Sequence, residues 1–238
     1  MNLDGVHAIV TGAAGGIGSA LCRMLLDAGA ASVGALDLKP VEKSDARLIP
    51  LRADIRDVAH VREAVAQFPT LHVLIHAAAV LLDGAVAAAS FRGMKKYPEE
   101  LWDTTLDTNL KGAFLIAREA IPSMMRAKQG VIVNISSISR AGRAGQAAYA
   151  ASKGGVVALT VSLAQELAPH RIRAVAIAPG LVDTPMAAKI PEAHRNEMLA
   201  RVAIGRMGNP CEIAHAARFC IENEFFNGRV LEVDGGAF

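Results

Sequence analysis

Short apolar segments alternate with longer stretches of helical periodicity along the chain. In the helical stretches apolar residues recur three and four positions apart, as Ile17, Leu21 and Leu25 do. The predicted strands are residues 6–10, 32–37, 47–52, 72–76, 131–135, 172–177 and 229–233. The predicted helices are residues 17–28, 58–68, 99–126, 148–168 and 211–221. This alternation predicts a mostly parallel, seven-stranded sheet with helices on both faces.

The order of these segments predicts a single doubly wound α/β domain of the Rossmann type over residues 1–238, because no linker, repeat or low-complexity tract divides the chain. Pro122 should kink the helix at residues 99–126 or split off its end. Residues 179–206 should form a loop with one or two short helices that binds the substrate. In such domains ligands lie beyond the carboxyl ends of the strands.

A glycine-rich turn joins the first strand to the first helix. Residues 11–18 read T-G-A-A-G-G-I-G, in which Gly12, Gly16 and Gly18 have the spacing G-x-x-x-G-x-G. Glycine allows a tight turn and a close approach of the backbone to a phosphate, and a helix N-terminus offers free N–H groups to an anion. The turn therefore predicts a dinucleotide site.

Asp37 ends the second strand, 19 residues after Gly18. A carboxylate at this position can accept hydrogen bonds from the ribose hydroxyls of adenosine and repels a 2′-phosphate. Leu38 brings no positive charge, although Lys39 and Lys43 follow nearby. The pattern favours NAD over NADP as the cofactor, and the alternative is a solvated aspartate in a loop.

Tyr149 and Lys153 are four residues apart in a helical stretch, so their side chains share one face of the helix. A free phenol has a pKa of roughly 10 and is a poor base at neutral pH. We expect the ammonium of Lys153 to lower the pKa of Tyr149, so that the pair exchanges a proton with an alcohol or a ketone. The alternative is a surface pair without chemistry.

Further small or polar residues follow the other predicted strands. Asp54 comes after the third strand, Ala77 after the fourth, Ser136 and Ser137 after the fifth, and Pro179 after the sixth. The carboxyl ends of parallel strands meet at one edge of a sheet, so these residues should lie near the glycine turn. Their convergence predicts one site rather than several.

Together these motifs resemble the short-chain dehydrogenase/reductase family in its compact one-domain form. The matching segments are residues 11–18, 109–112, 134–137, 149–153, 179–180 and 234–236, with Asp37, Asp54 and Thr184. The resemblance covers nearly the whole chain. It implies hydride transfer between a nicotinamide cofactor and a secondary alcohol or ketone, in a homotetramer.

The resemblance also implies a role for each matching residue. Tyr149 is expected to be the general acid/base, and Lys153 to lower its pKa and bind the nicotinamide ribose. Ser137 is expected to hydrogen-bond the substrate oxygen, and Asn109 to support a water-linked proton relay with Lys153. The expected cofactor contacts are Gly12, Gly16, Ile17, Gly18, Asp37, Asp54, Ile55, Ala77, Tyr149, Lys153, Pro179, Gly180, Val182 and Thr184.

The chain departs from the family pattern in two places. The usual Asn-Asn-Ala-Gly after the fourth strand is H-A-A-A at residues 76–79, which puts a methyl group near the cofactor ribose. We interpret His76 as a packed histidine at the end of a strand. Ser136 has the usual family interval to the tyrosine, but Ser137 aligns better with the strand end and is favoured, with Ser139 as a third candidate.

Two subgroups of the family share local motifs with the chain. Residues 145–155 are similar to type II 3-hydroxyacyl-CoA dehydrogenases, and residues 136–140 resemble some 3-oxoacyl reductases. We expect NAD-dependent oxidation of a secondary alcohol, with a 3-hydroxyacyl thioester as the leading substrate. The alternatives are an NADPH-dependent 3-oxoacyl reductase and a cofactor-binding sensor or scaffold without turnover. Three basic residues either meet CoA phosphates or are merely solvated: Arg92, Lys95 and Lys96.

The composition argues against other classes of protein. Of 238 residues, 52% are hydrophobic and 20% charged, and the net charge is +2. No dense basic cluster, long uncharged apolar run or secretory signal pattern is visible, and the histidines share no metal-ligand spacing. The three cysteines fit reduced thiols. We expect a cytoplasmic protein with no metal, nucleic acid or membrane partner.

Overall fold

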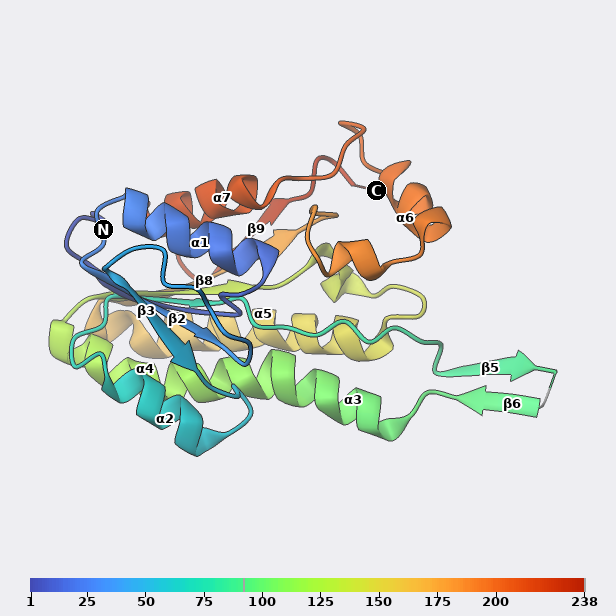
Figure 1. Ribbon diagram of the computed structural model, residues 1–238, viewed down its shortest axis with the longest axis horizontal. Helices are drawn as coiled ribbons and strands as arrows, with labels where there is room; N and C mark the ends of the chain where they lie inside the picture. The colour runs from blue at the N-terminus through green and yellow to red at the C-terminus, as the bar shows by residue number, and fades with distance from the viewer. Residues whose placement is uncertain (92, 238) are drawn as a thin grey trace.

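A seven-stranded sheet runs through the centre of the computed structural model, which describes residues 1–91 and 93–237 (Figure 1). Its strands are β1 (His7–Thr11), β2 (Ser32–Asp37), β3 (Leu48–Arg52), β4 (Val73–His76), β7 (Gly130–Ile135), β8 (Ile172–Pro179) and β9 (Val230–Val233). Their order is β3-β2-β1-β4-β7-β8-β9, and every neighbouring pair is parallel. The predicted doubly wound α/β fold is confirmed.

The strand order reverses between β1 and β4. The chain first moves outward from β1 to β2 and β3, and then returns to place β4 on the other side of β1. The register pairs Thr11 with His76 and His76 with Asn134, so the ends of β1, β4 and β7 are level. A crevice forms above such a switch point because the connections on its two sides diverge.

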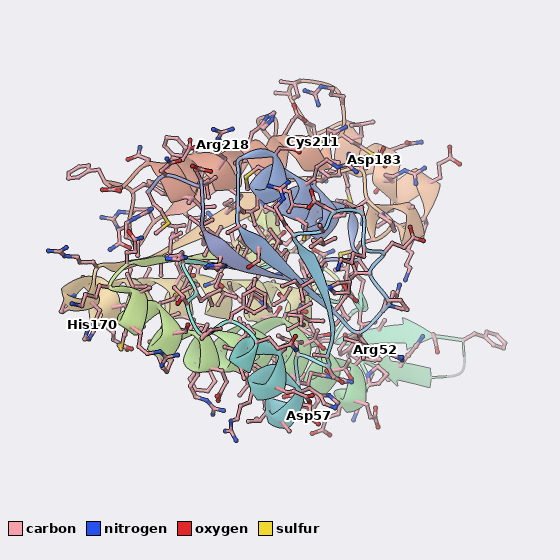
Figure 2. The ribbon with its side chains drawn as sticks, turned by 60° about the vertical axis from the view of Figure 1, so that its left-hand side comes forward. Arg52, Asp57, His170, Asp183, Cys211 and Arg218 are labelled. Atoms are coloured by element: carbon pink, nitrogen blue, oxygen red, sulfur yellow. The ribbon has the colours of Figure 1, made fainter. Side chains whose placement is uncertain are left out.

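Helices cover both faces of the sheet (Figure 1). One face carries α1 (Gly16–Asp27) and α7 (Pro210–Glu222); the other carries α2 (Val58–Ala66), α4 (Gly112–Ala127) and α5 (Ala147–Leu167). Alternate residues of each strand serve the two faces: Val10 and Val133 pack towards α1 and α7, whereas Ile9 and Ile132 pack towards α2 and α4. Charged side chains such as Arg218 and Asp57 lie on the outside of these layers (Figure 2).

The stretch Ala147–His170, formed by α5 and a short turn after it, is long and apolar enough to cross a membrane by composition alone. It packs against β8 of the sheet, and 44% of its most apolar window is buried within the protein. These contacts account for its apolar composition as a core helix.

The helix predicted at residues 99–126 consists of three parts. These are α3 (Glu99–Leu106), a π-helical segment (Asp107–Lys111) and α4. Pro122 lies inside α4, which continues to Ala127, so the end of the helix is not split off at this residue. The neighbouring residues hold the segment in place, because Ser123 Oγ donates hydrogen bonds to the carbonyls of Phe68 and Pro69, and Met124 is fully buried. The irregularity lies instead at Asn109, and π turns are frequent at functional sites.

A hairpin of β5 (Ala87–Ser90) and β6 (Gly93–Lys96) was not predicted from the sequence. It projects from the body of the molecule, and its described residues are exposed (Figure 1). Alanine and lysine are poor strand formers, so the segment carries no strand pattern. Residues 179–206, in contrast, contain the predicted short helices, at Ala187–Lys189 and in α6 (Glu192–Leu199).

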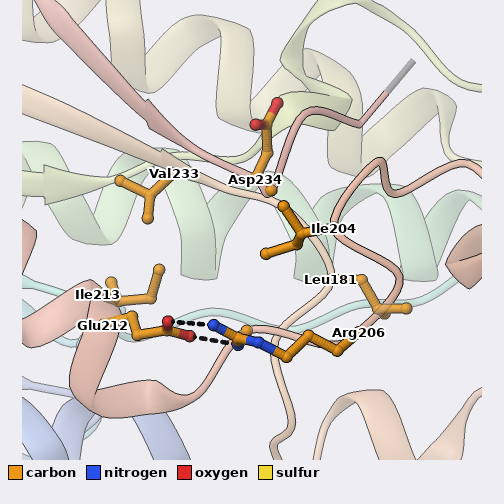
Figure 3. A pocket seen from close by; sticks show the side chains of 9 residues that line it. Leu181, Ile204, Arg206, Glu212, Ile213, Val233 and Asp234 are labelled. Carbon is orange, nitrogen blue, oxygen red and sulfur yellow. Dashed lines mark hydrogen bonds and ion pairs between the residues drawn. The ribbon is translucent and has the colours of Figure 1, made fainter.

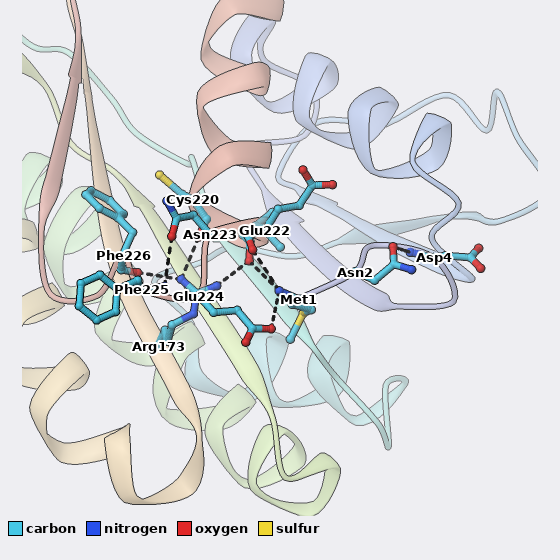
Figure 4. Close-up of polar contacts among 11 residues, drawn as sticks. Met1, Asn2, Asp4, Arg173, Cys220, Glu222, Asn223, Glu224, Phe225 and Phe226 are labelled. Carbon is cyan, nitrogen blue, oxygen red and sulfur yellow. Dashed lines mark hydrogen bonds and ion pairs between the residues drawn. The ribbon is translucent and has the colours of Figure 1, made fainter.

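Arg173 of β8 ties the C-terminal end of α7 to the sheet (Figure 4). Its guanidinium donates hydrogen bonds to the carbonyls of Cys220 and Phe226, both at 2.8 Å, and to that of Ile221. The last carbonyls of a helix have no partner within the helix, and a cation complements the helix dipole there. Arg173 therefore satisfies acceptors that would otherwise be left unpaired.

Replacing Arg173 with Met should lower the free energy of unfolding by about 2–3 kcal/mol, because partly buried carbonyls lose their charged donor. Urea denaturation followed by circular dichroism measures this change. Arg229→Met is the matched control, since Arg229 is exposed and should change stability by less than about 0.5 kcal/mol. Equal losses in the two variants would contradict the role assigned to Arg173.

Candidate active site

A cleft of about 1110 Å³ lies above the carboxyl ends of the central strands. Much of its wall consists of residues predicted to contact a cofactor. These are Gly12, Gly16, Ile17, Gly18, Asp37, Asp54, Ile55, Ala77 and Thr184. A second pocket, of about 120 Å³ near the C-terminus, is lined by Leu181, Ile204 and the Arg206–Glu212 ion pair (Figure 3). Only the larger cleft has the volume for a dinucleotide and a substrate.

The glycine turn packs directly on the end of β4. Gly12 has a φ of +70°, and a side chain there would come within 2.7–2.8 Å of the backbone of Ala77 and Ala78. Thr11 Oγ1 accepts hydrogen bonds from the N–H groups of the same two alanines, at 3.2 and 3.1 Å. No side chain caps the N-terminus of α1 at Gly15, so the first N–H groups of the helix are free to bind an anion at the cleft.

The carboxylate of Asp37 is held by two backbone donors. Ala14 N–H donates to Oδ2 at 3.0 Å and Lys39 N–H to Oδ1 at 2.9 Å. The side chain of the following Leu38 is 59% exposed. The carboxylate of Asp37 therefore places a fixed negative charge in the lining of the cleft. The ribose hydroxyls of a bound dinucleotide can donate hydrogen bonds to it.

The next strand end brings Asp54 and Ile55 to the same wall. Asp54 forms an ion pair with Arg56 at 2.7 Å, and the Arg56 guanidinium holds the pKa of the Asp54 carboxyl below its usual range. Ile55 is buried and packs against Gly112 at the start of α4. This part of the cleft wall therefore combines the apolar side chain of Ile55 with the partly exposed carboxylate of Asp54.

Tyr149 and Lys153 lie on one side of α5, as the spacing predicts. The Nζ atom of Lys153 is 5.7 Å from the centre of the Tyr149 ring. Lys153 is only 1% exposed, and its ammonium donates a hydrogen bond to the carbonyl of Ile135 at 2.7 Å. Burial lowers the pKa of Lys153 from 10.5 to about 8, so the buried amine is still mostly charged at neutral pH.

The pKa of Tyr149 moves in the direction opposite to our expectation. Burial raises the pKa to about 12; the nearby hydroxyl of Ser137 lowers it by a smaller amount, and the charge of Asp83 adds to the rise. Lys153 loses its proton at lower pH than Tyr149, so in the protein alone no ammonium remains when the phenol ionises. The expectation that Lys153 lowers the pKa of Tyr149 is therefore wrong for the protein without a ligand.

The serines after β7 have different surroundings. Ser136 is buried, and its hydroxyl donates to the carbonyl of Lys153 at 2.9 Å. Ser137 is partly exposed, and its hydroxyl lies beside the phenol of Tyr149 and accepts a hydrogen bond from Ser139 N–H. Of the three candidates, Ser137 has its hydroxyl beside the tyrosine.

Asn109 lies in the π-helical segment and is fully buried. Its Oδ1 accepts a hydrogen bond from Val80 N–H at 2.8 Å, and its amide donates to Val80 O and to Ser152 Oγ. Ser152 in turn donates to the carbonyl of Tyr149. The side chain of Asn109 thus connects the segment after β4 to the helix that carries the tyrosine.

His76 is fully buried at the end of β4, as we interpreted it from the sequence. Its Nδ1 is 2.9 Å from Thr11 Oγ1. Burial, with a smaller effect of the Lys153 charge, lowers the pKa of His76 to about 3. The imidazole is therefore neutral at physiological pH and braces the strand end against the glycine turn.

Some residues named from the sequence lie outside the lining of the cleft. The four proposed catalytic residues do not line it, and neither do three proposed cofactor contacts: Pro179, Gly180 and Val182. Gly180 packs on Asp234, and Val182 is buried in the core. Arg92 lies outside the described residues, and Lys95 and Lys96 are exposed on β6, away from the cleft lining.

Asp83 and Gln146 are among the polar residues of the cleft that sequence reasoning missed. They are joined by a hydrogen bond from Gln146 Nε2 to Asp83 Oδ2 at 3.0 Å. The position of Gln146, three residues before Tyr149, was a signal that could have found it. Nothing local indicates Asp83, because its place depends on the path of the chain after β4.

Comparisons with known proteins agree with this geometry. Residues 6–195 match the family model described as short chain dehydrogenase. The chain is 34% identical to a 3-oxoacyl-[acyl-carrier-protein] reductase, FabG, of Thermotoga maritima over 99% of both chains. It is 35% identical to the human 3-hydroxyacyl-CoA dehydrogenase type-2, over 98% of this chain and 95% of the human protein. It is also 33% identical to Nodulation protein G of a Rhizobium species, over 98% and 97%.

The chain therefore belongs to the short-chain dehydrogenase family. As a member of that family it is an oxidoreductase that acts on a hydroxyl or ketone group. Such an enzyme uses a nicotinamide cofactor.

Replacing Lys153 with Met should stabilise the fold by about 2 kcal/mol at pH 7. The change in the lysine pKa from 10.5 to about 8 corresponds to on the order of 3 kcal/mol, and the lost hydrogen bond to Ile135 offsets about 1 kcal/mol. Between pH 8 and 10.5 the unfolded chain binds more protons than the folded one, so the wild type gains stability as the pH rises through this range.

The difference in free energy of unfolding between Lys153→Met and the wild type should therefore be largest below pH 8 and decrease towards pH 10.5. Urea unfolding at pH 7 and pH 10 measures it. Lys96→Met serves as the control, since Lys96 is exposed and should show no such pH dependence. A variant less stable than the wild type at pH 7 would refute the cost assigned to the buried charge.

Proposed function

We propose that the protein is an NAD-dependent dehydrogenase that interconverts a secondary alcohol and a ketone, with a 3-hydroxyacyl thioester as its leading substrate. The observation that carries this proposal is the Tyr149–Lys153 pair on α5, the helix whose N-cap residue Gln146 lines the same cleft as the glycine turn. The printed names of two relatives, a 3-oxoacyl reductase and a 3-hydroxyacyl-CoA dehydrogenase, support the substrate class.

The residues of the cleft fit a dinucleotide along its whole length. The free N–H groups at the start of α1 suit the pyrophosphate, and Asp37 suits the adenosine ribose. Thr184 packs on Gly16 and narrows the cleft towards the reactive end. When bound, nicotinamide supplies the site that accepts or donates the hydride.

Tyr149 exchanges the proton with the substrate oxygen. With a pKa of about 12 the phenol is protonated at neutral pH, so it is ready to donate a proton to a ketone that is being reduced. In the oxidation of an alcohol the phenol must first lose its proton, and its raised pKa opposes that loss at neutral pH. The rate of oxidation should therefore rise with pH more steeply than the rate of reduction.

Ser137 and Asn109 support this proton transfer. The Ser137 hydroxyl lies beside the phenol, where it can donate a hydrogen bond to the oxygen that gains charge as the alcohol loses its proton. Asn109 fixes the segment after β4 and, through Ser152, the turn of α5 that carries Tyr149. We propose that Asn109 also supports the proton relay that ends at Lys153.

We propose residues 179–206 as the substrate-binding segment. Several of them line the open side of the cleft and provide apolar surface with a few polar groups: Thr184, Pro185, Met186, Lys189, Ile190, Pro191 and His194. A lining of this kind suits an acyl chain whose reacting carbon is next to Tyr149.

A second candidate is an NADPH-dependent 3-oxoacyl reductase; the printed name of the Thermotoga maritima relative supports the 3-oxoacyl reductase part of it. The fixed carboxylate of Asp37 supports NAD instead, since a 2′-phosphate would meet a negative charge there. We also propose a cytoplasmic homotetramer. The free thiols of all three cysteines and the exposed Trp102 and Phe114, on α3 and α4, support it.

Replacing Asp37 with Ala should raise KM for NAD about tenfold to a hundredfold, because ribose hydroxyls lose a charged acceptor. It should affect NADP less or improve its use. Initial rates with both cofactors, measured through the absorbance of the reduced nicotinamide, test this. Lys39→Ala is the control for the neighbouring loop. A wild type that prefers NADP would overturn the proposed cofactor.

Replacing Tyr149 with Phe should lower kcat by about a factor of 10²–10⁴, because the proton loses its donor and acceptor. Binding of NAD, measured by calorimetry, should change little, since the ring keeps its shape. A variant that retains turnover would show that the tyrosine is not the acid/base. A wild type that binds NAD but oxidises no secondary alcohol would favour a sensor or scaffold.

A further inference from the structure

Asp83 and Gln146 both line the cleft, and Gln146 is the N-cap residue of α5, three residues before Tyr149. Besides their mutual hydrogen bond at 3.0 Å, Gly84 N–H donates to Gly145 O at 2.8 Å, so two hydrogen bonds join these segments. The Tyr97 hydroxyl donates to the carbonyl of Leu82 at 2.6 Å. The backbone on both sides of Asp83 is thus held in place, and one oxygen of the carboxylate accepts a hydrogen bond.

The charged group of the pair is the Asp83 carboxylate, which lines the cleft. Gln146 is 7% exposed; one of its two amide N–H groups donates to Asp83, and its buried Oε1 has no partner among the described residues. A carboxylate donates nothing when it is ionised. Within residues 1–91 and 93–237, no cation lies within ion-pair distance of Asp83. The negative charge therefore acts uncompensated on whatever occupies this end of the cleft.

The reacting oxygen lies within electrostatic reach of this charge. Asp83 is hydrogen-bonded to Gln146, the N-cap residue of α5, and Tyr149 lies one helical turn further along that helix. In agreement with this placement, the charge of Asp83 raises the pKa of Tyr149. When the substrate oxygen is bound at Tyr149, the groups attached to the reacting carbon lie beside Asp83 or beside residues 179–206. A carboxylate on those atoms would face a like charge, whereas a thioester carbonyl and sulfur carry none.

We propose that Asp83, oriented by Gln146, is a specificity-determining residue that rejects substrates with a carboxylate near the reacting carbon. The 3-hydroxyacyl group is then taken as a neutral ester or thioester and not as the free acid. This inference rests on the proposed function and narrows its substrate class. At the separations found within a cleft, repulsion between two carboxylates corresponds to about a tenfold loss in kcat/KM or more.

The test compares 3-hydroxybutyrate with its N-acetylcysteamine thioester, which lacks the phosphates of CoA and is uncharged. The wild type should prefer the thioester. Asp83→Asn, which keeps the shape of the side chain, should raise kcat/KM for the free acid about tenfold and change that for the thioester less than threefold. Gln146→Ala should shift the ratio in the same direction. Glu63→Gln, an exposed acid on α2 outside the cleft lining, should leave it unchanged.

A ratio that stays the same in Asp83→Asn, or equal changes for both substrates, would overturn the inference. If the wild type oxidises neither compound, the proposed substrate fails instead. The same comparison is then made between whichever neutral secondary alcohol is oxidised and its carboxylate-bearing analogue. The two failures are thereby distinguished.

A measurement that needs no turnover tests the placement of the charge. The chain has 2 tyrosines, so ¹³C-labelled tyrosine gives two NMR titration curves, which Tyr149→Phe assigns. The charged groups that face Tyr149 are Asp83, from the segment after β4, and Lys153 on its own helix. Asp83→Asn should lower the pKa of Tyr149. An unchanged Tyr149 curve would refute the proposal.

Discussion

The hydrogen bond from the Lys153 ammonium to the carbonyl of Ile135 is the interaction on which the site depends. It fixes a charged amine inside the protein, at the end of a central strand and under the ring of Tyr149. A buried charge needs partners, and here one backbone carbonyl is the partner that the protein itself provides. The site is thus organised around a group whose burial costs stability and whose charge is useful for catalysis.

The surroundings of that lysine are braced from several elements. Thr11 joins the glycine turn to His76 and to the backbone after β4, and Asn109 joins the same segment to α5. Gly12 is required here by the protein's own packing, since a side chain would collide with that segment. The cofactor turn, the strand ends and the tyrosine helix are consequently held as one unit, so that their relative positions change little.

The order of the two pKa values gives the site a direction. In the protein without a ligand the pKa of Tyr149 is higher than that of Lys153. The phenol is therefore protonated at neutral pH and can donate a proton, whereas it must first lose that proton to act as a base. The carboxylate of Asp83 raises the pKa of Tyr149 further, and it also places a negative charge in the lining of the cleft. One side chain therefore affects both the proton transfer and the choice of substrate.

The sequence by itself determined the sheet, the glycine turn, Asp37 and the shared face of Tyr149 and Lys153, because periodicity along a segment and the topology of strand ends control these features. Only the tertiary structure decided the π turn at Asn109, the nearness of Asp83 to Tyr149 and the direction of the tyrosine pKa. Each of these depends on burial and on contacts between segments far apart in the chain. For the pKa of Tyr149, the effect of burial is larger than the effect that the spacing predicts for the charge of Lys153.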